Sequence, residues 1–154
     1  MSHHSTERLL LVDDDPLMRR TAKRVIERRL GVRVTAVGGA DDALAQIRGG
    51  ERFDVAVVDL EMPGVDGLAL LDRLRRLAPD LPAGLWSGSD RLHEVGPGSA
   101  AFLVAKTQPI GDLLLAVELV LEAEAGRTAL RRSGVVPRPG RASEDGGNGG
   151  SRCG

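Results

Sequence analysis

The stretch Phe53-Asp54-Val55-Ala56-Val57-Val58-Asp59-Leu60-Glu61-Met62-Pro63-Gly64 decides the fold of this chain. Four consecutive apolar residues lead directly into the carboxylate of Asp59, and the Pro63-Gly64 pair then interrupts any regular element. A short unbroken apolar run is typical of a strand buried on both faces, as in a parallel sheet. An acid at the carboxyl end of such a strand lies where open α/β sheets bind their ligands. Asp59 is therefore the first candidate for a functional residue.

Strand and helix patterns alternate along the whole chain around this run. The expected strands are 9–12, 32–37, 53–59, 85–87 and 100–105, and the expected helices are 16–30, 40–48, 67–77 and 111–125. Alternation of this kind predicts a parallel sheet with helices on both faces and right-handed crossovers. The Gly96-Pro97-Gly98 triplet would break a helix between the last two strands. We therefore expect a stunted fourth helix there.

Composition predicts one folded domain with disordered ends. The 154 residues are 42% hydrophobic but only 2% aromatic, so the core must be aliphatic. We expect a disordered N-terminus at 1–6, a folded domain at 7–126, and a disordered tail at 127–154 that is rich in Gly, Arg and Pro. The tail carries six arginines against two acids, a net charge of +4, which leaves −5 for residues 1–126. A folded part with that charge argues against nucleic-acid binding.

Targeting signals are missing from the sequence. Cys153 is the single cysteine, so no disulfide can form within the chain, which suits a reducing compartment. No run approaches the 18 or more apolar residues of a membrane-spanning helix, and the N-terminus lacks an apolar leader segment. We expect a cytoplasmic protein with no membrane contact.

Polar residues end four of the expected strands. Asp13 and Asp14 follow the first strand, Asp59 the third, Ser87 the fourth and Lys106 the fifth. In a doubly wound parallel sheet these ends lie along one edge. Three carboxylates there would repel by about 4 kcal/mol for each close pair at an effective dielectric constant near 20. We therefore expect a cation among them, and their hard oxygen atoms suit Mg²⁺.

The remaining groups at this edge suit an anionic ligand. Lys106 offers a positive charge that can pair with Asp59 or with a phosphoryl oxygen. Ser87 offers a hydroxyl donor, and the neighbouring Gly88 leaves room for a bulky group. Asp15 stands directly before Pro16, so it is expected to cap the first helix rather than to join the site.

Four of these stretches occur together in one known family. Leu11-Val12-Asp13-Asp14-Asp15-Pro16, then Val58-Asp59-Leu60-Glu61-Met62-Pro63-Gly64-Val65-Asp66-Gly67, then Ser87-Gly88, then Lys106 follow in order and spacing. Over roughly residues 7–125 the chain resembles the receiver domain of two-component response regulators. The resemblance implies a flavodoxin-like, doubly wound sheet of five parallel strands in the order 2-1-3-4-5. It also implies a phosphoacceptor that catalyses its own phosphotransfer and dephosphorylation, rather than an enzyme acting on a separate substrate.

The resemblance implies a role for each residue of the site. Asp59 would accept the phosphoryl group from a phosphohistidine of a histidine kinase or a phosphotransfer protein. Asp14 and Asp59 would bind Mg²⁺ directly together with the backbone carbonyl of Glu61, and Asp13 would act through a water. The phosphoryl group would be held by Ser87, Gly88 and Lys106.

The sequence departs from the family on the output side. The family usually has Lys-Pro after the fifth strand, whereas Lys106 is followed by Thr107, Gln108 and Pro109. The family's aromatic switch position is Leu103 here, and Phe102 lies one residue earlier, on the opposite face of the strand. No DNA-binding output domain is expected, so signalling would be by contact with an unknown downstream protein. The unusually apolar last helix also suggests a possible homodimer.

Two other functions remain open at this point. The altered output region is compatible with a pseudo-receiver, a binding module that is never phosphorylated. Haloacid-dehalogenase-like phosphatases also begin with an apolar strand and an Asp-x-Asp pair, which Asp13 and Asp15 would form. Those enzymes want Thr or Val two residues after the second acid, where this chain has Leu17.

Overall fold

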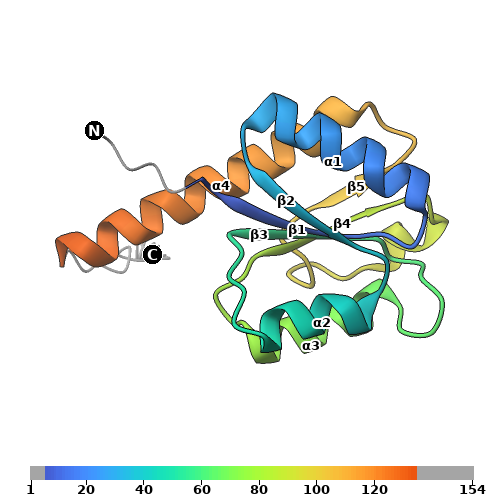
Figure 1. The fold of residues 1–154 in the computed structure, drawn as a ribbon, viewed down its shortest axis with the longest axis horizontal. Helices are drawn as coiled ribbons and strands as arrows, with labels where there is room; N and C mark the ends of the chain where they lie inside the picture. Colours follow the sequence, from blue (N-terminus) through green and yellow to red (C-terminus); the bar gives the residue numbers. More distant parts are fainter. Residues whose placement is uncertain (1–5, 135–154) are drawn as a thin grey trace, which may run out of the picture.

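A computed structural model describes residues 6–134 and shows a five-stranded sheet between two layers of helices (Figure 1). The predicted segments 1–6 and 127–154 therefore lie mostly outside the described residues. The elements, in chain order, are β1 (Arg8–Val12), α1 (Pro16–Leu30), β2 (Arg33–Val37), α2 (Ala40–Arg48), β3 (Val55–Val58), α3 (Gly67–Leu77), β4 (Ala83–Ser87), the 3₁₀ turn η1 (Asp90–Glu94), β5 (Leu103–Ala105) and α4 (Ile110–Ser133).

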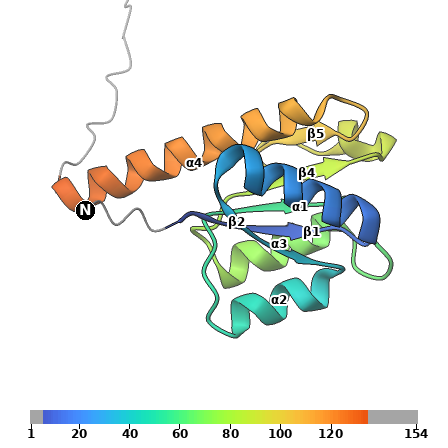
Figure 2. The ribbon, with the colours of Figure 1, turned by 45° about the horizontal axis from the view of Figure 1, so that its top comes forward.

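All five strands are parallel, in the order β2-β1-β3-β4-β5, as predicted. Helices α1 and α4 cover one face of the sheet, and α2 and α3 cover the other (Figures 1 and 2). The doubly wound arrangement places the carboxyl ends of β1, β3, β4 and β5 along one edge. Within residues 6–134, no helix combines the length and apolarity that crossing a bilayer requires.

The two faces of the sheet have separate, mainly aliphatic cores, because successive residues of a strand point to opposite faces. The core under α1 and α4 contains Leu9, Leu11, Val55, Val57, Trp86 and Val104 from the sheet. The core under α2 and α3 contains Leu10, Val12, Ala56, Val58 and Leu85. Strand β3 is buried on both faces throughout, which explains its unbroken apolar sequence.

Helix α3 shows a shift of the expected buried face. The sequence predicts a leucine stripe at 68, 71, 74 and 77, but the fully buried leucines are Leu70, Leu71 and Leu74, and Leu77 is 43% exposed. A step of three residues advances only about 300° around a helix of 3.6 residues per turn. Four leucines at that spacing therefore spread over half the circumference, and one face cannot bury them all.

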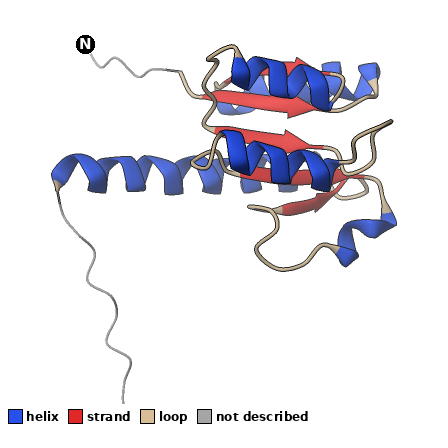
Figure 3. Cartoon of the chain, turned by 90° about the horizontal axis from the view of Figure 1, so that it is seen from below, coloured by secondary structure: helices blue, strands red, loops and turns tan. Residues whose placement is uncertain are grey.

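Helix α4 ends at Ser133, so the predicted end at Ala125 is wrong and the first residues of the predicted tail are helical. Gly126 costs about 1 kcal/mol relative to alanine inside a helix, which lowers stability without ending the helix. The helix ends at Gly134, whose φ of 68° is left-handed and whose amide donates to the Arg131 carbonyl. Its last turns project past the sheet (Figure 3) and are exposed.

The region between β4 and β5 contains little regular structure, as predicted. A single 3₁₀ turn, η1, takes the place of a fourth helix, and the chain then turns at Gly98 with a φ of 80°. Strand β5 covers only three of the six predicted residues. The pairing with β4 nevertheless reaches further back, because the Leu85 amide donates to the Phe102 carbonyl and the Ala101 amide donates to the Ala83 carbonyl.

One close contact on β4 predicts a large effect of a single methyl group. A Cβ atom at Gly84 would overlap the Phe102 ring, whereas a Cβ at Gly126 would meet nothing within 4 Å. We expect Gly84→Ala to lower the free energy of unfolding by about 1–3 kcal/mol through overpacking. The same substitution at Gly126 should raise it by about 0.5–1 kcal/mol. Urea unfolding of both variants checks this, and equal effects of the two changes would contradict it.

Candidate functional site

The candidate site lies at the carboxyl edge of the sheet, where the strand ladder fixes the backbone of its residues. The Asp59 amide donates to the Val12 carbonyl at 2.9 Å, and the Lys106 amide donates to the Ser87 carbonyl at 2.9 Å. The Asp13 amide donates to the carbonyl at the end of β2 at 3.1 Å. Asp13, Asp59 and Lys106 are each the first residue after a strand, and Ser87 is the last residue of β4. Their main chains are already hydrogen-bonded, so the backbone that carries each functional side chain is fixed.

Three carboxylates meet at this edge. Oxygen atoms of Asp13, Asp14 and Asp59 all lie within 4.8 Å of one another. Asp13 is 1% exposed and Asp59 is 8% exposed, whereas Asp14 is open to solvent. Hard oxygen donors with one open side suit a divalent cation that keeps part of its water shell. The donor set therefore fits a metal ion of the Mg²⁺ type.

Lys106 neutralises the buried pair of acids. Its Nζ donates to Asp13 Oδ2 at 2.6 Å and to Asp59 Oδ2 at 3.1 Å. Burial lowers the pKa of Lys106, but the hydrogen bonds and negative charges of Asp13 and Asp59 outweigh it, so the pKa lies above its usual 10.5. The ammonium group also lies 5.1 Å from the centre of the Trp86 ring.

The other oxygen of Asp59 accepts two hydrogen bonds. Ser87 Oγ donates to Asp59 Oδ1 at 2.6 Å, and the Glu61 amide donates to the same oxygen at 3.3 Å. Ser89, which no motif predicts, donates from its hydroxyl to Glu61 Oε1 at 2.7 Å and from its amide to Ser87 Oγ at 3.3 Å. Its position two residues after Ser87 is the one sequence signal that could have found it. Asp59 thus points into the site with both oxygens engaged.

Asp13 is held by residues around the start of α1. The Asp15 amide donates to Asp13 Oδ1 at 2.9 Å, and Arg19 Nη1 donates to the Asp13 carbonyl at 2.7 Å. No sequence pattern points to Arg19, since a bond from a side chain to a main-chain carbonyl leaves no motif. Asp15 itself caps α1, accepting hydrogen bonds from the Leu17 and Met18 amides, as predicted. The Asp-x-Asp pair of the phosphatase alternative therefore does not converge on one ligand.

Two glycines border the site in different ways. A Cβ at Gly67 would overlap the Asp59 carbonyl oxygen, so the start of α3 packs directly on the backbone of the acid. A Cβ at Gly88 would meet nothing within 4 Å, in agreement with the open space expected there. The close approach at Gly67 thus helps to fix the loop that carries Asp59.

Leu103, the first residue of β5, and Phe102, which directly precedes the strand, point to opposite faces of the sheet. Leu103 is 43% exposed, whereas Phe102 packs with the core under α1 and α4. The pairing of β4 with β5 runs through three consecutive residue pairs, so no bulge changes this register. No aromatic side chain therefore occupies the Leu103 position.

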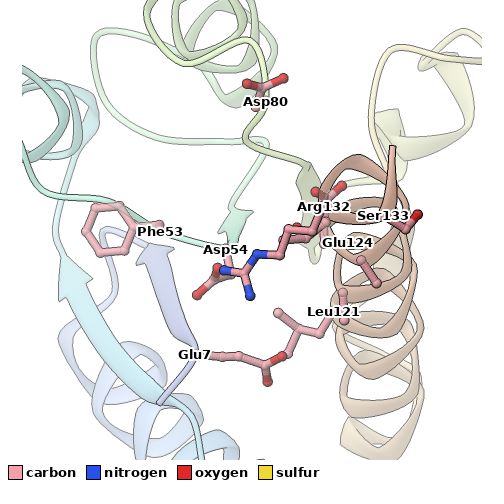
Figure 4. Close-up of a pocket in the computed structure, with 11 residues that line it drawn as sticks. Glu7, Phe53, Asp54, Asp80, Leu121, Glu124, Arg132 and Ser133 are labelled. Atoms are coloured by element: carbon pink, nitrogen blue, oxygen red, sulfur yellow. The ribbon is translucent and has the colours of Figure 1, made fainter. Parts of the chain in front are cut away.

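A wide groove of about 860 Å³ lies at the opposite, amino-terminal edge of the sheet (Figure 4). It runs beneath the projecting end of α4 and includes Glu7, Asp54 and Arg132, with Arg132 extending across it toward Asp54. None of the three clustered carboxylates lines it. The size of this groove therefore does not mark it as the reactive site.

Comparisons with known proteins identify the family of this chain. The family model of the response regulator receiver domain matches residues 9–117. A protein-glutamate methylesterase/protein-glutamine glutaminase of Paramagnetospirillum magneticum is 34% identical over 143 residues, which cover 86% of this chain and 37% of that protein. The chain thus spans about a third of the length of this curated relative.

Solved structures show the same fold. A structure described as an adenylate cyclase from Rhodopirellula baltica is 26% identical, with a TM-score of 0.74 over 83% of this chain and 96% of that one. A CheY-like receiver domain protein from Methanospirillum hungatei is 24% identical, with a TM-score of 0.70 over 80% of this chain and 99% of that one.

The raised pKa of Lys106 predicts a loss of stability at alkaline pH. The folded state holds this proton more tightly than the unfolded state, so the contribution is complete below about pH 10.5 and is lost as the pH rises through the folded pKa. The chain has no tyrosine, and Lys23→Arg leaves Lys106 as the sole lysine. Urea unfolding of Lys23→Arg between about pH 9 and 12 should show a decline that is absent when Lys106→Gln is added. Parallel pH profiles would contradict the prediction.

Proposed function

Because this chain belongs to the response-regulator receiver family, we propose that it accepts a phosphoryl group on Asp59 and signals through protein contacts. The observation that supports this most directly is the environment of Asp59. Its carboxylate is mostly buried, lies beside two further carboxylates, and is bonded by a lysine and a serine hydroxyl. A nucleophile, a cation site and donors for the transferred group are thus assembled at one sheet edge.

The transfer step follows from this arrangement. An oxygen of Asp59 attacks the phosphorus of a phosphohistidine, a P–O bond forms, and the bond to the histidine nitrogen breaks. The Lys106 ammonium, now bonded to Asp59 at 3.1 Å, exchanges that contact for an oxygen of the arriving group. Ser87 Oγ, at 2.6 Å from the same carboxylate, donates to another oxygen. Hydrolysis of the acyl phosphate by water returns the domain to its starting state.

The residues present also suit a bound Mg²⁺ ion. Asp14 and Asp59 would bind it directly with the Glu61 carbonyl, and Asp13 would do so through a water. When bound, the ion supplies charge neutralisation for the transferring group. Asp13 already bonds to Lys106, so its place beyond the direct ligands is consistent with its contacts.

The surface of α1 suits an acidic phosphodonor partner. Arg20, Arg24 and Arg28 are exposed and recur every four residues, so they form one basic stripe. Among residues 6–134, no ion pair joins this stripe to α4. We infer that a histidine kinase or phosphotransfer protein presents acidic side chains to it. The exposed Leu115 and Leu119 on α4 suit a different contact, with a downstream protein or with a second copy of the chain.

Incubation with acetyl phosphate and Mg²⁺, followed by intact mass measurement, tests the proposal. We expect one phosphoryl adduct on the wild-type chain and none on Asp59→Asn, because the amide is not a nucleophile of this kind. Asp54→Asn, which changes an acid just before β3, serves as the matched control and should retain the adduct. Lack of an adduct from acetyl phosphate and from a cognate kinase would favour the pseudo-receiver.

Metal binding can be followed by the fluorescence of Trp86, the single tryptophan, which lies against Lys106 at the site. We expect Asp14→Asn to weaken Mg²⁺ binding about tenfold or more, since loss of even a group that only orients a ligand costs about that much. Asp15→Asn removes the same charge one residue away and keeps a good helix cap, so it should bind Mg²⁺ nearly as the wild type does. Equal weakening by both changes would indicate a general charge effect instead.

A further inference from the structure

Two side chains outside the carboxylate cluster contact Lys106 or its neighbour in the chain: the Trp86 ring lies beside the Lys106 ammonium, and Gln108 bonds to Ala105. The residue after it is Thr107, so no proline ring fixes the backbone there. A lysine side chain is a flexible four-carbon stem and loses rotamer entropy when it is fixed in one place. Other contacts must therefore fix the backbone and the side-chain rotamer of Lys106. We propose that Gln108 and Trp86 are positioning residues that aim Lys106 at Asp13 and Asp59, an inference that rests on the proposed function.

Gln108 closes the turn that follows β5. Its side-chain Oε1 accepts a hydrogen bond from the Ala105 backbone amide at 2.9 Å, and its backbone amide donates to the Ala105 carbonyl at 3.0 Å. Its Nε2 donates to Asp112 Oδ2 at 3.0 Å, in the first turn of α4. One side chain thus joins the residue before Lys106 to the helix that follows. The Lys106 backbone is bracketed between this contact and its bond to the Ser87 carbonyl.

Trp86 supports the side chain of Lys106 from the core side. It is 5% exposed, belongs to the core under α1 and α4, and pairs in register with Val104. Its ring is therefore fixed by packing, and the Lys106 ammonium lies 5.1 Å from its centre. A rigid aromatic face attracts the cation and limits its rotamers. Gln108 thus fixes the backbone that carries the Lys106 side chain, and Trp86 limits the rotamers of that side chain.

The reactivity of Lys106 provides a test that does not depend on phosphorylation. Lys23 and Lys106 are the only lysines in the sequence, so Lys23 is an internal reference for competitive acetylation read by mass spectrometry. The Lys106 side chain is only 15% exposed and its Nζ is bonded to Asp13 and Asp59, so a reagent reaches this amine only when these contacts open. We expect Gln108→Ala and Trp86→Leu to raise the labelling of Lys106 relative to Lys23 about three- to tenfold, because loss of either positioning contact exposes the amine more often.

Conservative changes separate positioning from a general loss of structure. Trp86→Phe keeps an aromatic face and should stay near the wild-type labelling ratio, whereas Trp86→Leu should not. Gln108→Glu places a carboxylate against Asp112 and should raise labelling. Adding Asp112→Asn restores a donor to that pair, so the double variant should return toward the wild-type ratio. Gln46→Ala, on α2 at the other face of the sheet, is the control and should leave the ratio unchanged.

Hydrogen exchange gives a second measurement at the same contact. The Ala105 amide should lose protection in Gln108→Ala and keep it in the wild type and in Gln46→Ala, because only the first change removes its acceptor. The amides of β3 should stay protected in every variant, which shows that the core of the fold is retained.

Each positioning role can be overturned separately. A wild-type labelling ratio in Gln108→Ala would overturn the role of Gln108, whether or not the Ala105 amide loses protection. A wild-type ratio in Trp86→Leu would overturn the role of Trp86. Neither result depends on a phosphoryl adduct at Asp59. If the proposed function fails but the positioning roles hold, the variants still change the labelling ratio while acetyl phosphate gives no adduct.

Discussion

The site depends on the balance between two buried carboxylates and one buried ammonium group. Asp13 and Asp59 are each less than a tenth exposed, and like charges at that depth would repel strongly if they were left alone. Lys106 bonds to both of them and bridges the ends of β1, β3 and β5. Asp14, at the open side, adds a third carboxylate that suits a divalent cation. The lysine thus offsets the buried charge, and the exposed acid leaves the site open to a metal.

The strand order of the sheet brings these charged groups together. Parallel strands in the order β2-β1-β3-β4-β5 bring residues 13, 59, 87 and 106 to one edge although they are far apart in sequence. Hydrogen bonds of the strand ladder continue one residue beyond β1, β3 and β5, so these side chains start from a fixed backbone. The close packing of Gly67 on the Asp59 carbonyl constrains the remaining loop. Chemistry is thereby concentrated at one edge, while the projecting end of α4 and its groove lie at the other.

The region around β5 departs from the family pattern, whereas the carboxylate cluster follows it. The aromatic residue next to β5 packs inward on Gly84, and a leucine occupies the exposed position. The region before it contains one 3₁₀ turn in place of a helix. The contacts that lead away from Asp59 run through Lys106 and the turn that Gln108 closes to the first turn of α4. Hydrogen bonds link Asp59 to Lys106, and link the turn to both β5 and α4.

The sequence by itself determined the fold class and the residues that meet at the site, and its resemblance to receiver domains added the strand order. An apolar run ending in Asp59 and polar residues at four strand ends are local patterns, and the rules of parallel sheets convert them into one edge. Only the tertiary structure decided how these residues are held: Arg19 on the Asp13 carbonyl, Ser89 on Glu61, Trp86 beside Lys106, and Gln108 on Ala105. It also decided that α3 buries Leu70 and that α4 continues past Gly126 to Ser133. The physical reason is that such contacts depend on distances between side chains and main-chain atoms of separate elements, and on a weak glycine penalty that neighbouring residues can outweigh.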